Sequence, residues 1–201
     1  MSRPVLFGIV AMAAVVVASN ILVQHLLGAW LTWGALTYPL AFLVTDLVNR
    51  FAGPVAARRV VVVGFAVGVV CSLVASQVGA TTLRIALGSG IAFLVAQGLD
   101  VVIFDRLRQG RWWRAPVVSS LAGSAVDTLL FFSIAFAATF AFLDPGDPNG
   151  WAREAVPLLG LGPALPLWVS LAVADFGVKV ALALLALLPF GLITRAGRRA
   201  A

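Results

Sequence analysis

Two pairs of opposite charges lie one helical turn apart inside stretches that are otherwise apolar. Asp46 and Arg50 are four residues apart, and so are Asp175 and Lys179. Side chains at this spacing share one face of a helix and can neutralise each other. A charge near the centre of a bilayer costs about 2.5–3.5 kcal/mol, so such residues usually face a protein interior and pair there. Each pair is therefore either an internal salt bridge or part of a polar site, and Arg50 has the further option of extending to the membrane interface.

Asp127 has no charged partner within its own apolar stretch. It lies about ten residues from the end of that stretch, near the expected middle of a membrane-spanning helix, as Asp175 and Lys179 do. A buried carboxylate at this depth needs a neighbouring helix, water or a ligand. This makes Asp127 the strongest single functional candidate, and Ser124 and Thr128 lie beside it on the same turn of the helix.

Uncharged polar residues extend this pattern to other apolar stretches. Asn20 and Gln24 are spaced to share one helix face, and Gln97 and Asp100 another. Hydrogen bonds between helices would explain each pair alone. Five of the six stretches carry such positions at overlapping depth, which favours a polar pocket near the midplane, where secondary transporters bind substrate. The candidate substrate-binding residues are Asn20, Gln24, Gln97, Asp100, Asp127, Thr128, Asp175 and Lys179, with Asp46 and Arg50 as a gating or structural ion pair.

The elements that must position these residues are membrane-spanning helices. Of the 201 residues, 62% are hydrophobic and only 11% are charged, whereas soluble domains are about 25% charged. Open strands are excluded at membrane depth because lipid cannot satisfy sheet edges. We predict an all-α, six-helix transmembrane bundle that forms one domain over residues 1–201, with an extracytoplasmic loop at 143–164. The spans are expected near 5–27, 30–49, 60–79, 85–105, 117–142 and 165–193.

The basic residues predict the orientation of this bundle. Cytoplasmic loops of membrane proteins are enriched in Lys and Arg. With six spans, eleven arginines fall on one side, and only Arg84 and Arg153 fall on the other. Both termini are therefore expected in the cytoplasm. The eleven are Arg3, Arg50, Arg58, Arg59, Arg106, Arg108, Arg111, Arg114, Arg195, Arg198 and Arg199, and the only lysine of the chain is Lys179.

Two further patterns concern packing and the long loop. Gly64 and Gly68 are spaced to let two helices approach closely, which favours internal packing over a dimer seam, although a homo-oligomer stays open. The segment DPGDPNG predicts turns, and the segment from Trp151 to Leu161 is expected to form a short helix at the membrane interface. The chain has one cysteine and one histidine, so no disulfide, metal site or cofactor is expected.

Recognisable catalytic motifs are missing from the sequence. It contains no GxxxxGK[ST], HExxH, GxSxG or CxxC, so neither ATPase activity nor a nucleophile and base set is expected. The arginines lie in short clusters between apolar stretches, which is typical of cytoplasmic loops and not of a nucleic-acid-binding surface. Channel, transporter and membrane enzyme remain as classes, and the midplane polar residues favour a transporter without enzymatic activity.

Four segments together resemble the queuosine precursor transporter family, also called vitamin uptake transporters. They are TWGALTYPLAFLVTDLVNRFAGPVAARR, QGLDVVIFDRLRQGRWWRAP, SSLAGSAVDTLLFFSIAF and ADFGVK, and the resemblance covers about residues 17–191. It implies a multi-pass importer of the bacterial inner membrane for 7-cyano-7-deazaguanine or 7-aminomethyl-7-deazaguanine, which are salvaged for queuosine modification of tRNA. Ser124 stands where the family pattern has Asn. The family's polar signature falls on Asn20, Asp46, Arg50, Arg58, Asp100, Arg108, Asp127, Thr128, Asp175 and Lys179.

A deazaguanine would suit the polar residues of this chain. Its N1–H and exocyclic amine form a donor pair that matches one carboxylate, which Asp127 or Asp175 would supply. Its O6 accepts a hydrogen bond from Lys179, Asn20 or Gln97, and its flat face stacks on an aromatic ring. The stacking ring is expected to be Trp33, Phe131 or Phe132.

Several points stay open at this stage. The alternatives to a precursor importer are a substrate-binding membrane subunit that borrows a separate ATPase, or a transporter of another purine-like or vitamin-like compound. The preferred precursor is open, and so is the choice between facilitated and ion-coupled transport.

Overall fold

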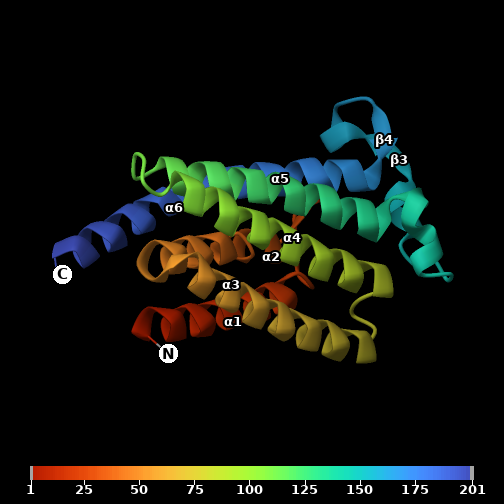
Figure 1. Ribbon diagram of the computed structural model, residues 1–201. Helices are drawn as coiled ribbons and strands as arrows, with labels where there is room; N and C mark the ends of the chain where they lie inside the picture. The colour runs from red at the N-terminus through yellow and green to blue at the C-terminus, as the bar shows by residue number, and fades with distance from the viewer. Residues whose placement is uncertain (1, 200–201) are drawn as a thin grey trace.

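The computed structural model describes residues 2–199 as a bundle of long helices (Figure 1). The long helices are α1 (Arg3–Leu22), α3 (Leu40–Gln77), α4 (Leu83–Leu107), α5 (Arg114–Phe136) and α6 (Leu167–Arg199), and the short α2 (Gly34–Thr37) precedes α3. Five helical segments of the described chain, with α2 and α3 counted as one, are long and apolar enough to cross a membrane. Met1, Ala200 and Ala201 of the expected domain lie outside the described residues, as do the side chains of Arg198 and Arg199.

Helix α3 is broken at Gly53, where a non-helical backbone separates two arms. Gly53 has φ 82° and ψ 173°, and Pro54 follows it. This positive φ strains any residue with a side chain, so glycine is required here. Val48 before the break and Val60 after it both pack on Gly8 of α1, and the chain reverses direction between the arms (Figure 1). The two arms correspond to the second and third expected spans.

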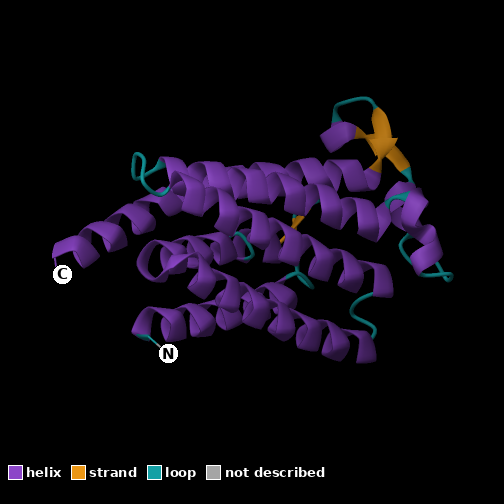
Figure 2. Ribbon diagram, viewed as in Figure 1, coloured by secondary structure: helices purple, strands orange, loops and turns teal. Residues whose placement is uncertain are grey.

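The connections outside the long helices contain short strands and 3-10 turns (Figure 2). Strands β1 (Leu26–Leu27) and β2 (Leu31–Thr32) pair, as do β3 (Ala155–Pro157) and β4 (Ala164–Pro166). The 3-10 helices are η1 (Ala138–Leu143), η2 (Gly150–Arg153) and η3 (Leu158–Gly160). The interfacial helix expected from Trp151 to Leu161 is therefore wrong. Pro157 and Pro163 lack a backbone donor, which favours the extended hairpin over a continuous helix.

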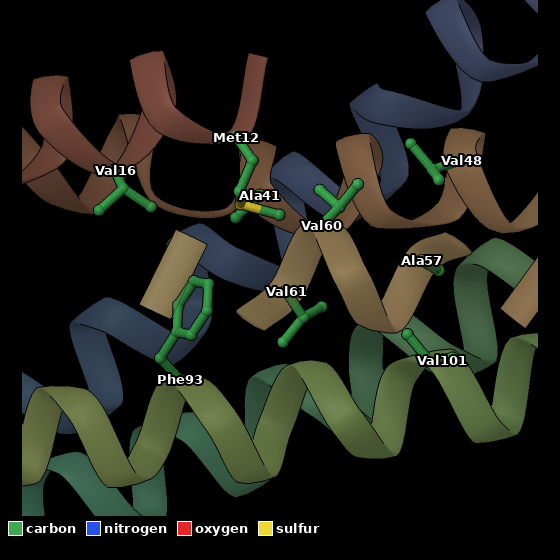
Figure 3. Close-up of a cluster of buried hydrophobic side chains, with 9 residues drawn as sticks. All are labelled: Met12, Val16, Ala41, Val48, Ala57, Val60, Val61, Phe93 and Val101. Atoms are coloured by element: carbon green, nitrogen blue, oxygen red, sulfur yellow. The ribbon is translucent and has the colours of Figure 1, made fainter. Parts of the chain in front are cut away.

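The apolar core joins α1, both arms of α3 and α4 (Figure 3). Met12 of α1 and Val60 of α3 are fully buried, and Phe93 of α4 is 5% exposed. A Cβ built on Gly64 would lie 2.6 Å from Met12 Cγ, so the glycine lets the two helices approach. This confirms the expected role of Gly64 in packing within the chain.

Arg84 fastens the end of α5 to the long loop. Its guanidinium is fully buried. The sequence pattern had placed Arg84 only on the side of the membrane that carries few basic residues. Its Nε donates to Ile134 O at 3.1 Å and its Nη2 to Ala137 O at 2.6 Å. These carbonyls lie at the C-terminus of α5, where a cation also interacts favourably with the helix dipole. Its Nη1 forms an ion pair with Asp147 at 2.9 Å.

Asp147 of this loop forms ion pairs with two arginines, Arg84 of α4 and Arg153 of the loop itself. Arg153 also contacts it, and the hydrogen bond from Arg153 lowers the pKa of the Asp147 carboxyl. Asn149 is 1% exposed and donates to Ala135 O at 2.9 Å and to Thr82 Oγ1 at 3.0 Å. The loop between α5 and α6 is thus held to the bundle by specific polar contacts.

Candidate functional site

Lys179 lies at the centre of a buried charged network between α5 and α6. Its ammonium donates to Asp127 Oδ2 at 2.7 Å, to Asp175 Oδ2 at 2.5 Å and to Thr128 Oγ1 at 3.0 Å. All three donors of the ammonium are therefore used. Thr128 Oγ1 in turn donates to Asp175 Oδ2 at 2.8 Å. The i,i+4 contact expected for Asp175 and Lys179 is confirmed, and Asp127 has the partner on a neighbouring helix that its position required.

Tyr38 completes this network from a third element, the segment between α2 and α3. Its hydroxyl donates to Asp127 Oδ1 at 2.9 Å, and the Lys179 ammonium lies 5.6 Å from the centroid of its ring. A cation at this distance is attracted by the face of the ring. Asp127 is thus held on both oxygens, by a phenol and by an ammonium. The Lys179 network is defined here as Tyr38, Asp127, Thr128, Asp175 and Lys179.

The members of the Lys179 network differ in exposure. The side chains of Lys179 and Asp127 are 4% and 5% exposed, whereas that of Asp175 is 15% exposed. Asp175 is therefore the more exposed of the two carboxylates. One lysine stands against two carboxylates, so a ligand that donates hydrogen bonds can compete for the carboxylate oxygens.

A second buried group of polar side chains lies between α3, α4 and α5. Asp46 and Asp100 are 1% and 0% exposed, and hydrogen bonds from Thr45 to Gln97 and from Asn49 to Val101 hold α3 and α4 side by side at this level. Ser119 Oγ donates to Asp46 Oδ1 at 3.2 Å, and Ser120 Oγ donates to Asp46 Oδ2 at 3.3 Å. We call this group the Asp46–Asp100 pair. Asp100, predicted as substrate-binding, thus lies with Asp46 and not with Asp127.

Gln97 and Asn49 surround the Asp46–Asp100 pair. Gln97 is fully buried, and its Oε1 accepts a hydrogen bond from Thr45 Oγ1 at 2.6 Å. Asn49 is also fully buried, and its Nδ2 donates to Val101 O at 3.0 Å. The shared face expected for Gln97 and Asp100 is confirmed by their joint burial on α4. Their role in substrate binding stays a prediction.

Arg50 contacts the end of α4. Its Nη1 donates to Arg108 O at 2.9 Å, a carbonyl at the C-terminal cap of that helix, where a cation is favourable. Asp46 faces the serines of α5 instead. A gating or structural ion pair between Asp46 and Arg50 stays a prediction.

A cavity of about 330 Å3 shares Tyr38 with the Lys179 network. It lies between α1, the second arm of α3 and α4, and its lining includes Asn20, Phe65, Phe93 and Tyr38. Ligand pockets commonly have volumes of about 300–1,000 Å3. Tyr38 therefore belongs both to this cavity, which we call the Tyr38 cavity, and to the Lys179 network. Asn20 Nδ2 donates to Val16 O at 2.9 Å within its own helix.

Gln24 does not share a helix face with Asn20, because α1 ends at Leu22. Gln24 lies in the following turn and is exposed. The apolar stretch continued to residue 27, but residues 26–32 form the β1–β2 hairpin around Gly28, whose φ is +70°. The expected helical spacing of these two residues is therefore wrong, since the helix stops two residues before Gln24.

The aromatic residues expected to stack on a ligand lie in other surroundings. Phe131 and Phe132 contact each other edge to face with ring centroids 5.0 Å apart, and both pack in an aromatic cluster with Phe136. Trp33 is 47% exposed. Tyr38 supplies the aromatic ring of the Lys179 network, and the sequence pattern did not single it out. Its signal was weak: the only tyrosine in the chain, next to Pro39 at the start of a long helix.

A narrow cleft leads from the Lys179 network toward the Asp46–Asp100 pair. Lys179, Ser124, Ser120 and Asp46 line it, and it has room for about one water molecule. Ser124 is 1% exposed, so this departure from the family pattern lies on the wall between the two polar groups. The serines of α5 were also missed as partners of Asp46, although Ser120, Ser124 and Asp127 follow one another at helical spacing.

These features define a multi-pass membrane protein that keeps charged groups inside its helix bundle. Residues 32–194 match a family model described as "Putative vitamin uptake transporter". The chain belongs to this family of transporters.

Three relatives carry names that agree with the family. A "Queuosine precursor transporter" of Escherichia coli (strain K12) is 34% identical, over 87% of this chain and 79% of the relative. A "Probable queuosine precursor transporter" of Haemophilus influenzae is 38% identical, over 61% of this chain and 57% of the relative. One of Bacillus subtilis (strain 168) with the same description is 26% identical, over 81% and 71%. No solved structure matches this chain.

Proposed function

We propose that this protein imports queuosine precursors, 7-cyano-7-deazaguanine or 7-aminomethyl-7-deazaguanine, across the bacterial inner membrane, and that the Lys179 network binds the base. The buried lysine held by two aspartates from two helices is the observation that carries this proposal. Ion pairs at this depth are costly and usually mark substrate pathways. The names of the relatives support the substrate class.

The Lys179 network offers the groups that a deazaguanine needs. A carboxylate of Asp127 or Asp175 accepts from N1–H and the exocyclic amine, and the Lys179 ammonium donates to O6. Both kinds of group are already hydrogen-bonded to each other, so the base replaces protein contacts with its own. Tyr38 lines the Tyr38 cavity and belongs to the Lys179 network. Its ring is the aromatic surface available for stacking.

Six spans with both termini in the cytoplasm are part of the proposal. A continuous helix over residues 34–77 would be about 66 Å long, about twice the hydrocarbon thickness, so we count its two arms as two spans. The N-terminus, the Gly53 break and the α4–α5 connection then lie at one end with the C-terminus (Figure 1). The exposed arginines Arg58, Arg59, Arg106, Arg111 and Arg114 lie at this same end, as cytoplasmic loops require.

The test is uptake in bacterial cells that cannot make the precursor and lack their own importer. Cells that produce the protein are fed either deazaguanine, and queuosine-modified tRNA is measured. We expect modification with the wild type and a loss of at least about tenfold with Asp127→Asn, since a bidentate contact to a base is worth about 1–3 kcal/mol.

The matched control is Asp105→Asn. Asp105 lies on α4 with a side chain 40% exposed, and its replacement should leave uptake unchanged. Equal membrane amounts of the variants are verified by immunoblot. Normal uptake by Asp127→Asn would refute the binding site, and no modification with either compound in the wild type would refute the substrate class.

A further inference from the structure

The buried side-chain atoms that lack a hydrogen-bond partner all belong to one part of the described chain. They are Asn49 Oδ1, Gln97 Nε2 and both carboxyl oxygens of Asp100, and these three side chains are fully buried. An unsatisfied buried polar atom costs about 1–3 kcal/mol. Three of the four atoms are acceptors. The region around the Asp46–Asp100 pair is therefore short of donors, in contrast with the Lys179 network.

Two carboxyl groups that are buried side by side on adjacent helices, as Asp46 and Asp100 are, do not both stay ionised, because the like charges repel and neither is solvated. They titrate as one unit. A single proton held between Asp46 and Asp100 removes the repulsion and supplies the missing donor to an Asp100 oxygen. The hydroxyls of Ser119 and Ser120 stabilise the remaining negative charge on Asp46.

The charged groups around the pair come from α3 and α6. Arg50 follows Asp46 by one turn on α3 and donates to Arg108 O at the end of α4. Lys179 of α6 faces Asp46 along the cleft. From α5 the neighbours are the serines and not a charged residue. The electrostatic state of the pair therefore depends on Arg50 and on Lys179, and the partners of Lys179 are the carboxylates of the proposed substrate site.

The two polar groups are close enough to influence each other. Ser119 and Asp127 are eight residues apart on α5, which corresponds to about 12 Å along the helix. The cleft between Lys179 and Asp46 has room for about one water molecule. A base that draws the lysine away from the cleft, or toward it, changes the field at Asp46.

We propose that the Asp46–Asp100 pair is a proton-binding site that couples import to the proton gradient. The proposal rests on the proposed function. A proton from the outer side binds to one carboxylate oxygen of the pair. The same carboxyl group later releases the proton to the cytoplasm, so that one proton crosses with each substrate.

The experiment uses the full-length protein in proteoliposomes with labelled deazaguanine. Uptake is measured with an inward proton gradient of about two pH units and without a gradient. The ratio of the two rates should be about ten or more for the wild type and about one for Asp100→Asn. At equilibrium, one proton per substrate sustains about a 100-fold accumulation under this gradient, since each tenfold ratio corresponds to 1.4 kcal/mol.

Asp105→Asn is again the matched control, because it makes the same substitution on α4 at an exposed carboxylate. It should keep the wild-type ratio. Should Asp100→Asn fail to fold, Asp46→Asn serves as the second variant. A pH-sensitive dye trapped inside the vesicles measures proton entry with substrate in the wild type. This measurement does not depend on whether either variant folds.

The outcomes separate the two proposals. Counterflow of labelled deazaguanine in the wild type without any response to the pH gradient refutes the proton site alone. A response to a sodium gradient in place of the proton gradient also refutes it, as does a wild-type ratio in both Asp variants. No counterflow in the wild type refutes the proposed function, and the proton site with it.

Discussion

Two pairs of aspartates, Asp127 with Asp175 and Asp46 with Asp100, are both buried inside the helix bundle but are stabilised differently. The first pair shares a lysine that makes three hydrogen bonds. The second pair is contacted by hydroxyls and leaves both oxygens of Asp100 without a partner. A satisfied pair opens only for a ligand with better hydrogen bonds, whereas an unsatisfied pair binds the smallest donor available. The first suits a base, and the second suits a proton.

The strongest test of this comparison is Lys179→Met, which makes the first pair resemble the second. Two buried carboxylates then lose their cation, which costs about 3–5 kcal/mol. We expect uptake to fall to background and the thermal midpoint in detergent, followed by tryptophan fluorescence, to fall by several degrees.

The triple variant Lys179→Met, Asp127→Asn, Asp175→Asn removes the uncompensated charges. It should recover most of the thermal midpoint and none of the uptake. Full stability of Lys179→Met alone would show that the network does not hold these helices together.

Arg84→Met tests a second buried cation, Arg84, which has no place in the proposed transport path. It leaves two carbonyls at the end of α5 without their donor and separates Asp147 from the bundle. We expect a loss of about 3 kcal/mol in the free energy of unfolding, since hydrogen bonds to charged groups are worth about 1.5–3 kcal/mol each.

For the Arg84→Met protein that remains folded, the concentration of deazaguanine at half-maximal uptake should match that of the wild type. A shift of more than about threefold in this concentration would assign Arg84 to the transport path and weaken the contrast between a structural cation and Lys179.

Tyr38→Phe should have the smallest effect. It keeps the ring and removes one hydrogen bond to Asp127, worth about 1.5–3 kcal/mol to a charged acceptor. The half-maximal concentration for uptake should change by about ten- to 150-fold with little change in stability. Tyr38→Ala, which also removes the ring, should weaken uptake further. Equal effects of the two variants would exclude stacking on this ring.

The helices could be predicted from the sequence because their signal is local. Apolar stretches of membrane length gave every long helix, and α4 at residues 83–107 lies within two residues of the expected 85–105. The end of α1 was missed because Val23, Leu26 and Leu27 continue the apolar pattern while Gly28 turns the chain. Apolar composition reports burial in lipid, and it does not report where a helix stops.

The site could be predicted only in part. The free-energy cost of placing a charge inside the membrane identifies a functional candidate, but it does not identify the partner of that charge. Asp127, Asp175 and Lys179 were recognised as candidates on that ground and lie together. Asp100 was predicted to bind substrate together with Asp127, yet it lies with Asp46, because spacing within one helix does not determine which neighbouring helix a side chain meets. Tyr38 carries no charge and starts a helix, so no energetic argument singled it out.

Lys179 is the only lysine in the chain, and it lies where the proposed substrate binds. An amine-reactive reagent therefore finds one lysine side chain, and the rate at which it reacts measures how often that side chain becomes accessible. Bound substrate should slow the reaction. The same single lysine gives a peptide map with one internal site for a lysine-specific protease, so the modified position is identified without ambiguity. The composition of this protein thus provides a reporter for its own conformational cycle.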